Sequence, residues 1–270
     1  MKIIIPAIAK HKVIVMHSIS RLSAQFPGAD VLIVCPQPKE YSWINWSNVT
    51  VEADDKYIPI SKNDIASLLL AEKRYVVGWY YQQILKYAIV IASNSSDVLI
   101  LDADTVLIKN FNYNDKVFYT SKEKNAAYFE HFRRLFNINP KLKASAITNF
   151  MWFNVDSLRE MLYEIEARHK DYWWLTILKI ANAIPGSGVF SEYETYANWI
   201  ANKYGPVTEV PIHIFRRGDL LAHSEDDYGK VISSVANKNY DAVAFEIEHK
   251  RNVIRQLCAW IVLTLAIRAW

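Results

Sequence analysis

The sequence of 270 residues contains few of the residues that mark fibrous, disordered or disulfide-rich proteins. It has 7 glycines, 9 prolines and 2 cysteines, while 51% of its residues are hydrophobic. These values exclude a collagen-like repeat and a low-complexity or disordered chain. Cys35 and Cys258 stand in apolar surroundings and form no CxxC pair. We therefore expect reduced core thiols in a reducing compartment.

Net charge and long apolar runs are scarce as well. The 31 Lys and Arg residues exceed the 28 Asp and Glu residues by only 3, without the basic stripe that nucleic-acid binding needs, so no nucleic-acid partner is expected. The longest apolar run, Leu257–Ile267, is about half of the roughly 20 residues that cross a bilayer. The first apolar stretch, Ile3–Ala9, contains Pro6 and is typical of a strand rather than a signal helix. We expect a cytoplasmic protein.

Short β-branched or aromatic segments alternate with helical patterns along the chain. This alternation predicts an α/β fold, with a mostly parallel central sheet flanked by helices and ligands at the carboxyl ends of strands. No break in composition divides the chain, so residues 1–270 are expected to form a single domain. The expected strands are Lys2–Ile8, Val31–Cys35, Val49–Glu52, Val98–Leu101, Val117–Thr120, Ile147–Asn154, Val207–Val210 and Ala242–Glu246. The expected helices are Val13–Gln25, Ile65–Arg74, Trp79–Ile91, Ala126–Phe136, Asp156–Arg168, Asp171–Ala183, Glu192–Lys203 and Ile247–Ile267.

The strongest motif is VLILDADTVL, residues 98–107. Four apolar residues end at Asp102, and Asp104 follows two positions later, on the same side of an extended chain. Two like charges in this arrangement are costly unless a cation binds, and Mg²⁺ or Mn²⁺ together with a diphosphate would balance them. Aspartates that only cap a turn are the alternative interpretation.

Two classes of enzyme use such a pattern. In Mg-dependent phosphohydrolases Asp102 would be the phosphoryl-accepting nucleophile and Asp104 its acid–base partner. That class normally starts on this strand, whereas several α/β units precede it here, and Gly218-Asp219 lacks the second aspartate that the class places nearby. The mid-chain position favours the nucleotide-sugar glycosyltransferases of the GT-A fold. A non-catalytic module that binds a nucleotide sugar is a third interpretation.

Four segments between about residues 75 and 200 carry a family resemblance. They are GWYYQQILK (78–86), LILDAD (99–104), FMWFN (150–154) and above all SEYETYANW (191–199). With them the sequence resembles a bacterial family of small glycosyltransferases associated with capsule and lipopolysaccharide synthesis. The resemblance implies a GT-A domain that uses Mn²⁺ or Mg²⁺ to transfer a sugar from a nucleoside-diphosphate sugar to a glycan or lipid-linked acceptor. The nucleotide-binding half would cover about residues 1–110 and the half that binds the acceptor and completes the metal site about residues 111–246.

Candidate donor-binding residues fall in two places. Gln82, Gln83 and Lys86 share one expected helix face, where Lys86 would neutralise a phosphate or hold the donor sugar. A solvated polar face is the alternative. Arg216 and Arg217 could clamp a diphosphate with bidentate hydrogen bonds, or form surface salt bridges instead.

Glu192 and Glu194 are the candidate catalytic residues. Both begin a helix after the loop PGSG (185–188), and a carboxylate near a helix N-terminus is stabilised as the anion. Such an anion suits a general base that takes the proton of an acceptor hydroxyl. Ser191 and Glu194 also match a capping box. We therefore favour Glu192 as the chemical residue and Glu194 as the cap.

Three histidines compete for a third position in the metal site: His213, His223 and His249. His249 is preferred, because the expected strand Ala242–Glu246 could deliver it there. Each histidine has a structural role as its alternative. Four aromatic residues could stack on a base or sugar, or pack in the core: Tyr80, Tyr81, Trp152 and Trp199.

The C-terminal segment, about residues 247–270, is expected to be helical. It places basic residues beside an apolar run that carries Trp260 and Trp270. This composition suits a helix lying on the inner face of an anionic membrane, which would give the protein a peripheral membrane contact. A buried helix that closes the sheet is the alternative.

Overall fold

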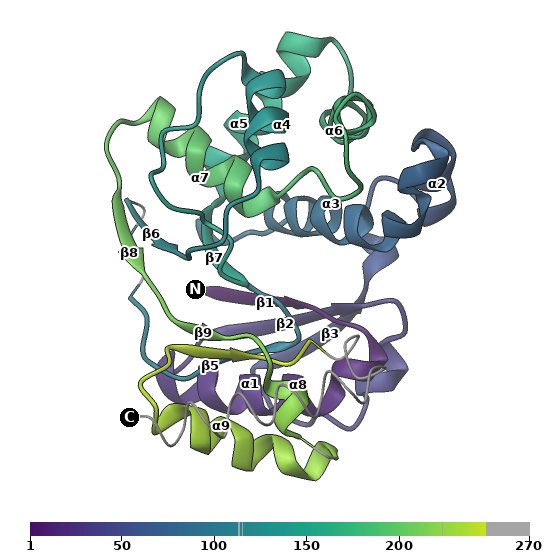
Figure 1. Cartoon of the computed structure of the whole chain (residues 1–270). Coiled ribbons are helices and arrows are strands. Elements are labelled where there is room, and N and C mark those ends of the chain that lie inside the picture. Colours follow the sequence, from purple (N-terminus) through teal and green to yellow (C-terminus); the bar gives the residue numbers. More distant parts are fainter. Residues whose placement is uncertain (113, 115, 223, 247–270) are drawn as a thin grey trace.

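The computed structural model describes residues 1–112, 114, 116–222 and 224–246. It confirms the α/β fold with a mostly parallel central sheet between helices (Figure 1). The five strands of this sheet have the order β3–β2–β1–β4–β7 and are parallel except for β7, which is antiparallel to β4. They are β1 (Lys2–Pro6), β2 (Asp30–Cys35), β3 (Val49–Ala53), β4 (Asp97–Leu101) and β7 (Phe150–Asn154).

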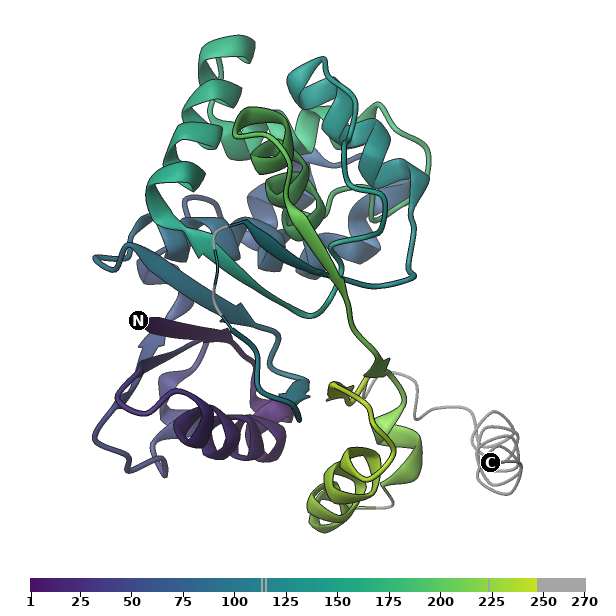
Figure 2. The same cartoon turned by 90° about the vertical axis from the view of Figure 1, so that its left-hand side faces the viewer.

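Helices cover both faces of the sheet, as the two perpendicular views show (Figures 1 and 2). The upper layer in Figure 1 contains α2 (Lys62–Leu68), α3 (Val77–Ile91), α4 (Ala126–Phe136), α5 (Val155–His169), α6 (Trp173–Asn182) and α7 (Glu192–Lys203). The lower layer contains α1 (Lys12–Gln25), α8 (Gly218–Leu221) and α9 (Tyr228–Ala236).

The apolar strands are buried on both faces because each face meets its own helical layer. In β4, Val98 and Ile100 pack in the cluster that includes α3 to α7, whereas Leu99 and Leu101 pack in the cluster that includes α1. All four side chains are fully buried. The strand is therefore fixed from both sides, and the polar residues that follow it emerge at a defined point on the sheet edge.

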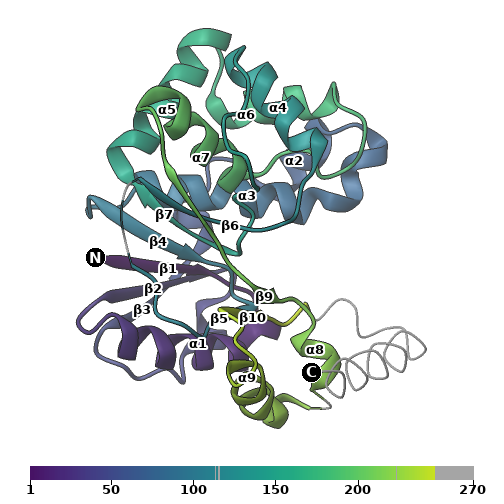
Figure 3. The ribbon, with the colours of Figure 1, turned by 60° about the vertical axis from the view of Figure 1, so that its left-hand side comes forward.

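Two smaller sheets return the later part of the chain to this edge. One pairs β6 (Val117–Thr120) with β8 (Thr208–Pro211), and β8 carries the chain from α7 down to β9 (Figure 3). The other has the order β5–β10–β9, with β5 (Thr105–Leu107), β9 (Ile214–Phe215) and β10 (Ala242–Ala244). Phe245 donates its N–H to the carbonyl oxygen of Asp104 at 2.7 Å, so residues 242–246 lie directly beside the acidic motif.

The predicted helix Ile65–Arg74 is wrong in its extent, because a side chain ends it early. The α-helix stops at Leu68, and a separate 3₁₀ helix covers Ala71–Val76. The amide of Asn182 donates to the carbonyl of Leu68 at 2.7 Å and accepts from the N–H of Leu70 at 3.0 Å. A distant side chain thus replaces the next helical turn. The sequence analysis also missed β5, β9, α8 and α9, which are short or depend on long-range pairing.

His131 of α4 predicts how the stability of the helical layer depends on pH. Burial lowers its pKa to about 4 from the ordinary 6.5, and its neutral ring donates from Nε2 to the carbonyl of Ile177 at 3.0 Å. The unfolded chain therefore takes up this proton first as the pH falls from 6.5 to 4. We expect the free energy of unfolding to drop by up to about 3 kcal/mol across this window.

Urea denaturation of the wild type and His131→Gln at pH 7.5 and pH 4.5 measures this contribution. The variant keeps an N–H donor but cannot titrate, so it should lose less stability on acidification than the wild type. Equal losses in the two proteins would contradict the assignment.

Candidate active site

The acidic motif lies where the sheet topology provides a ligand site. Asp102 and Asp104 follow the carboxyl end of β4, next to β1, where the order of the strands reverses. Such a switch point leaves a crevice at the carboxyl ends of the strands. Ala103 between them is buried, and Asp102 donates its backbone N–H to the carbonyl of Asn149 at 2.8 Å. Both carboxylates are partly exposed.

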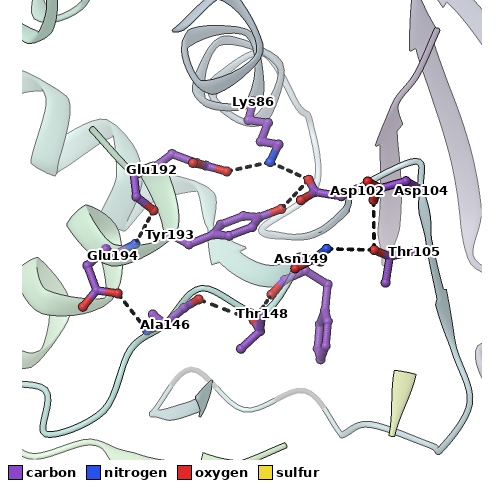
Figure 4. Close-up of polar contacts among 12 residues, drawn as sticks. Lys86, Asp102, Asp104, Thr105, Ala146, Thr148, Asn149, Glu192, Tyr193 and Glu194 are labelled. Carbon is purple, nitrogen blue, oxygen red and sulfur yellow. Dashed lines mark hydrogen bonds and ion pairs between the residues drawn. The ribbon is translucent and has the colours of Figure 1, made fainter. Parts of the chain in front are cut away.

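Lys86 joins the acidic motif to α7 (Figure 4). Its Nζ lies 2.5 Å from Oδ1 of Asp102 and 2.7 Å from Oε1 of Glu192. The ammonium also lies 4.4 Å from the ring centroid of Tyr193, whose hydroxyl donates to Oδ1 of Asp102 at 3.1 Å. The structure thus brings Lys86, Asp102 and Glu192 together in one ionic cluster.

This ionic cluster is deeply buried on the Glu192 side. Lys86 is 2% and Glu192 is 1% exposed. Burial alone would lower the pKa of Lys86, but the charges of Asp102 and Glu192 raise it above its ordinary value, so the lysine stays protonated. Burial also raises the pKa of Glu192, against the effect of Lys86. With its amide nitrogen turned toward Glu192, Gln83 donates to Oε1 at 3.2 Å.

The surroundings of Asp104 disfavour the charged form of its carboxyl group. Burial raises its pKa to about 7, and the charges of Asp102 and Glu246 add to this effect. The hydroxyl of Thr105 donates to Oδ1 of Asp104 at 3.1 Å and itself accepts from the amide of Asn149 at 3.1 Å. A cation between Asp102 and Asp104 would remove the repulsion that raises this pKa.

A cavity of about 820 Å³ opens in front of the acidic pair. Residues that follow β1, β2, β3 and β4 line it, together with α3 and the loop before α7. The charged and polar side chains that line it are Lys10, His11, Asp54, Lys62, Tyr75, Tyr81, Gln82, Gln83, Lys86, Asp102, Asp104, Tyr128, Ser187 and Glu246. All three helix α3 residues predicted to bind the donor therefore face this cavity.

Asp54 is a cavity residue that the sequence analysis missed. It follows β3 just as Asp102 follows β4, so the rule that ligands bind at strand ends could have identified it. It is only 6% exposed and is hydrogen-bonded to the hydroxyl of Tyr81. The ammonium of Lys62 lies 4.7 Å from the centroid of the Tyr81 ring. Asp54, Lys62 and Tyr81 therefore lie at the β3 end of the cavity, away from β4.

The loop PGSG is fixed in place as one wall of the cavity. The buried Nζ of Lys73 donates to the carbonyls of Ile184, at 2.7 Å, and Gly186. The hydroxyl of Tyr80 donates to the carbonyl of Ser187 at 2.8 Å. Tyr80 is therefore a packing residue, whereas Tyr81 lines the cavity. Of the other aromatic candidates, Trp152 packs among rings on the α1 side and Trp199 donates to Glu164 at 3.1 Å from a buried position.

The predicted capping box is half wrong. Ser191 does cap α7, since its Oγ accepts the N–H of Glu194 at 3.3 Å. The carboxylate of Glu194 does not fold back onto Ser191. Its Oε2 accepts from Ser145 Oγ at 2.9 Å and from Ala146 N at 2.8 Å, while its Oε1 accepts from Asn198 at 3.2 Å. Three donors thus satisfy this buried carboxylate, whereas a capping box would supply it with the single backbone N–H of Ser191.

The remaining predicted ligands lie elsewhere. Arg216 pairs with Glu123 at 2.9 Å and Arg217 pairs with Glu246 at 3.5 Å, so a diphosphate clamp stays a prediction. His213 is exposed and lines a separate cavity beside β9 and α9. His223 and His249 lie outside the described residues, as does the predicted C-terminal helix with Trp260 and Trp270.

The part of the chain that the structure describes holds no group of three His, Cys, Asp or Glu side chains able to bind one metal ion. Asp102 and Asp104 nevertheless supply two carboxylates of the kind that Mg²⁺ and Mn²⁺ prefer. Burial and the charge of Asp102 raise the pKa of Asp104, so a cation at this pair would stabilise its charged form. The donor set and its electrostatics therefore fit a divalent cation. None of the described helices is long and apolar enough to span a membrane.

The fold and site define an α/β protein with a ligand cavity and an acidic pair at the switch point of its sheet. The chain belongs to the family of unknown function DUF6492, which matches residues 7–227. A comparison with curated proteins finds no match.

Two solved structures are similar to most of the chain. One is the galactosyltransferase LgtC in complex with donor and acceptor sugar analogues, with a TM-score of 0.42, 12% identity and coverage of 91% of this chain and 87% of that one. The other is an active-site mutant of LgtC, with a TM-score of 0.39, 11% identity and coverage of 91% and 87%.

Proposed function

We propose that the protein is a metal-dependent glycosyltransferase that moves a sugar from a nucleoside-diphosphate sugar to a glycan or lipid-linked glycan acceptor. The observation that carries the proposal is the pair Asp102 and Asp104, which faces a cavity of about 820 Å³ at the switch point of the sheet. A nucleotide sugar needs such a cavity, and its diphosphate needs positive charge beside the acidic pair. The resemblance of four sequence segments to capsule and lipopolysaccharide glycosyltransferases supports surface polysaccharide synthesis as the context.

Asp102 and Asp104 would hold Mn²⁺ or Mg²⁺. When bound, the cation supplies the charge that stabilises the leaving diphosphate. No third ligand completes this pair among the described residues, although Glu246 faces the same cavity and its charge acts on Asp104. His249 remains the sequence-based candidate for that position.

Lys86 would bind the donor, because its ammonium faces the cavity while Asp102 and Glu192 hold it in place. Gln82 lies one helical turn away and faces the same cavity. Asp54 and Tyr81 at the other end would contact the nucleoside. Arg216 and Arg217 remain candidates for the diphosphate only if they leave Glu123 and Glu246.

The general-base prediction for Glu192 is untested, and the geometry supports a different role. Its carboxylate is 1% exposed and bonds to Lys86 and Gln83. A base must reach the hydroxyl proton that it removes. We therefore propose that Glu192 orients Lys86 and does not act as the general base for the acceptor hydroxyl.

Nucleotide-sugar hydrolysis tests the proposal. The purified protein is incubated with UDP-, GDP-, CDP- and dTDP-sugars, with Mn²⁺, Mg²⁺ or EDTA, and release of the nucleoside diphosphate is measured. We expect release from one nucleotide class, dependent on the cation, and a rise in melting temperature with that nucleotide and Mn²⁺.

A parallel panel of phosphomonoesters separates the alternatives. Phosphate release from these substrates would replace the proposal by the phosphohydrolase with Asp102 as nucleophile. Nucleotide-sugar binding without turnover, even with a panel of glycan acceptors, would indicate a binding module.

A further inference from the structure

Residues 141–147 form an irregular segment whose backbone N–H groups are held mainly by side chains. Each buried N–H needs a partner, and a segment without helix or strand must find it elsewhere. Asn198 accepts from Lys141 and Leu142 at 2.9 and 3.0 Å, and Glu209 accepts from Lys143 and Ala144 at 3.0 and 2.8 Å. Ser145 bonds to the backbone of Ser121, Ala146 to Glu194, and Ile147 to the hydroxyl of Ser145.

The segment delivers Asn149 to the acidic pair. Asn149 has a positive φ of 64°, a conformation that Asn tolerates better than most residues. Its carbonyl accepts the N–H of Asp102 at 2.8 Å, and its amide donates to Thr105 Oγ1 at 3.1 Å. Thr105 in turn donates to Asp104 at 3.1 Å. Asn149 thus bonds directly to the backbone of Asp102 and is linked to the carboxylate of Asp104 through Thr105 (Figure 4).

Three side chains outside the segment hold it, and Glu194 is the one that binds the residues closest in sequence to Asn149. It is 1% exposed, and both carboxylate oxygens accept only neutral donors: Ser145 and Ala146 at Oε2, Asn198 at Oε1. Burial raises the pKa of Glu194, and the hydrogen bonds from Ala146, Ser145 and Asn198 oppose this effect. A glutamine here would turn an NH₂ group toward at least one donor, because every contact at this position is made by a donor.

We propose that Glu194 is a positioning residue for the metal site: by holding Ser145 and Ala146 it fixes Asn149, and through Asn149 it sets the affinity of Asp102 and Asp104 for a divalent cation. This rests on the proposed function, which places the cation on these two carboxylates. Residues hydrogen-bonded directly to metal ligands typically change metal affinity by about 10- to 100-fold when they are replaced, so a residue farther out is expected to act at the lower end of this range. Glu194 therefore acts on the site without touching substrate.

Electron paramagnetic resonance of free Mn²⁺ measures the affinity without any turnover. The wild type, Glu194→Gln and the matched control Glu209→Gln are titrated with Mn²⁺ alone and with Mn²⁺ and UDP. We expect Glu194→Gln to weaken Mn²⁺ binding about 10-fold. Glu209→Gln, which releases the same segment farther from Asn149, should bind as the wild type does. Ser145→Ala removes the donor to Glu194 and the acceptor of the Ile147 N–H. It should weaken binding in the same direction, and it replaces Glu194→Gln if that variant does not fold.

The outcomes separate the inference from the function. A wild type that binds no Mn²⁺ under either condition overturns both the metal-dependent function and this inference. A wild type that binds, with Glu194→Gln and Ser145→Ala of equal affinity, overturns the inference alone. Equal weakening in Glu194→Gln and Glu209→Gln also overturns it, because general loosening of the segment would then account for the effect.

Discussion

Replacing Asp104 by asparagine is expected to lower metal-dependent donor hydrolysis by about 1,000-fold, which corresponds to a loss of about 4 kcal/mol of transition-state stabilisation. Asparagine keeps the shape of the side chain and can still accept from Thr105. It removes the charge that would hold the cation beside the leaving diphosphate. The loss should therefore appear in the rate at saturating donor and in the affinity for Mn²⁺.

The stability of the same variant should move the other way. The pKa of Asp104 is raised to about 7 by burial and by the charge of Asp102. A carboxyl whose pKa is raised by folding destabilises the folded state as the pH rises above its ordinary value of 3.8. Without metal, Asp104→Asn should therefore be at least as stable as the wild type at pH 8. Loss of activity would then have no explanation in misfolding.

The matched control lies at the other end of the same strand. Asp97 begins β4 and accepts from the amide of Asn154 at 3.1 Å, far along the strand from the cavity. Asp97→Asn should keep metal-dependent hydrolysis. Hydrolysis in Asp104→Asn at the wild-type rate, measured by nucleoside diphosphate release with and without EDTA, would disprove a catalytic metal at this pair.

Lys86→Met is expected to destabilise the protein by about 3–5 kcal/mol, because it leaves the buried carboxylate of Glu192 without its cation. The methionine fills a similar volume, so the cost comes from charge rather than from a cavity. Lys86 is 2% and Glu192 1% exposed, and their atoms are 2.7 Å apart. A pair on the surface would contribute only about 0–1 kcal/mol.

A double-mutant cycle isolates this interaction. Urea denaturation at pH 7 is compared for the wild type, Lys86→Met, Glu192→Gln and the double variant. The double variant should be more stable than Lys86→Met alone, since it no longer buries an unpaired charge. The double variant should still lose donor hydrolysis, because it lacks the Lys86 ammonium that would bind the donor. A cost below about 1 kcal/mol for Lys86→Met would show that the pair behaves as a surface contact.

The sequence was informative wherever a local pattern and a physical rule coincide. The apolar run before Asp102 predicted a buried strand, and the same strand now ends at the cavity. The spacing on helix α3 predicted that Gln82, Gln83 and Lys86 share a ligand face, and all three line that cavity. In contrast, the helix Ile65–Arg74 was wrong because Asn182, more than a hundred residues later, ends it with two hydrogen bonds.

Site details that depend on long-range contacts could not be predicted. The capping-box spacing predicted that the Glu194 side chain bonds to the backbone of Ser191. In the folded protein, Ser145 and Ala146 donate to the Glu194 carboxylate instead. Glu192 had the helix-terminal position of a base, yet packing buries it against Lys86. The role of each glutamate depends on hydrogen-bond and ion-pair partners that are distant in sequence. A local sequence pattern does not identify these partners.

The hydrophobic share of 51% by itself determined that this chain has a large apolar core, and residues 98–107 by themselves placed an acidic pair after a buried strand. Alternation of apolar strands and helices determined the α/β class. Only the tertiary structure decided which polar residues meet at the edge of the sheet. Asp54, Lys86 and Asp104 come from separate parts of the chain, and they line one cavity because β3 and β4 end at the same edge of the sheet and α3 packs on β1.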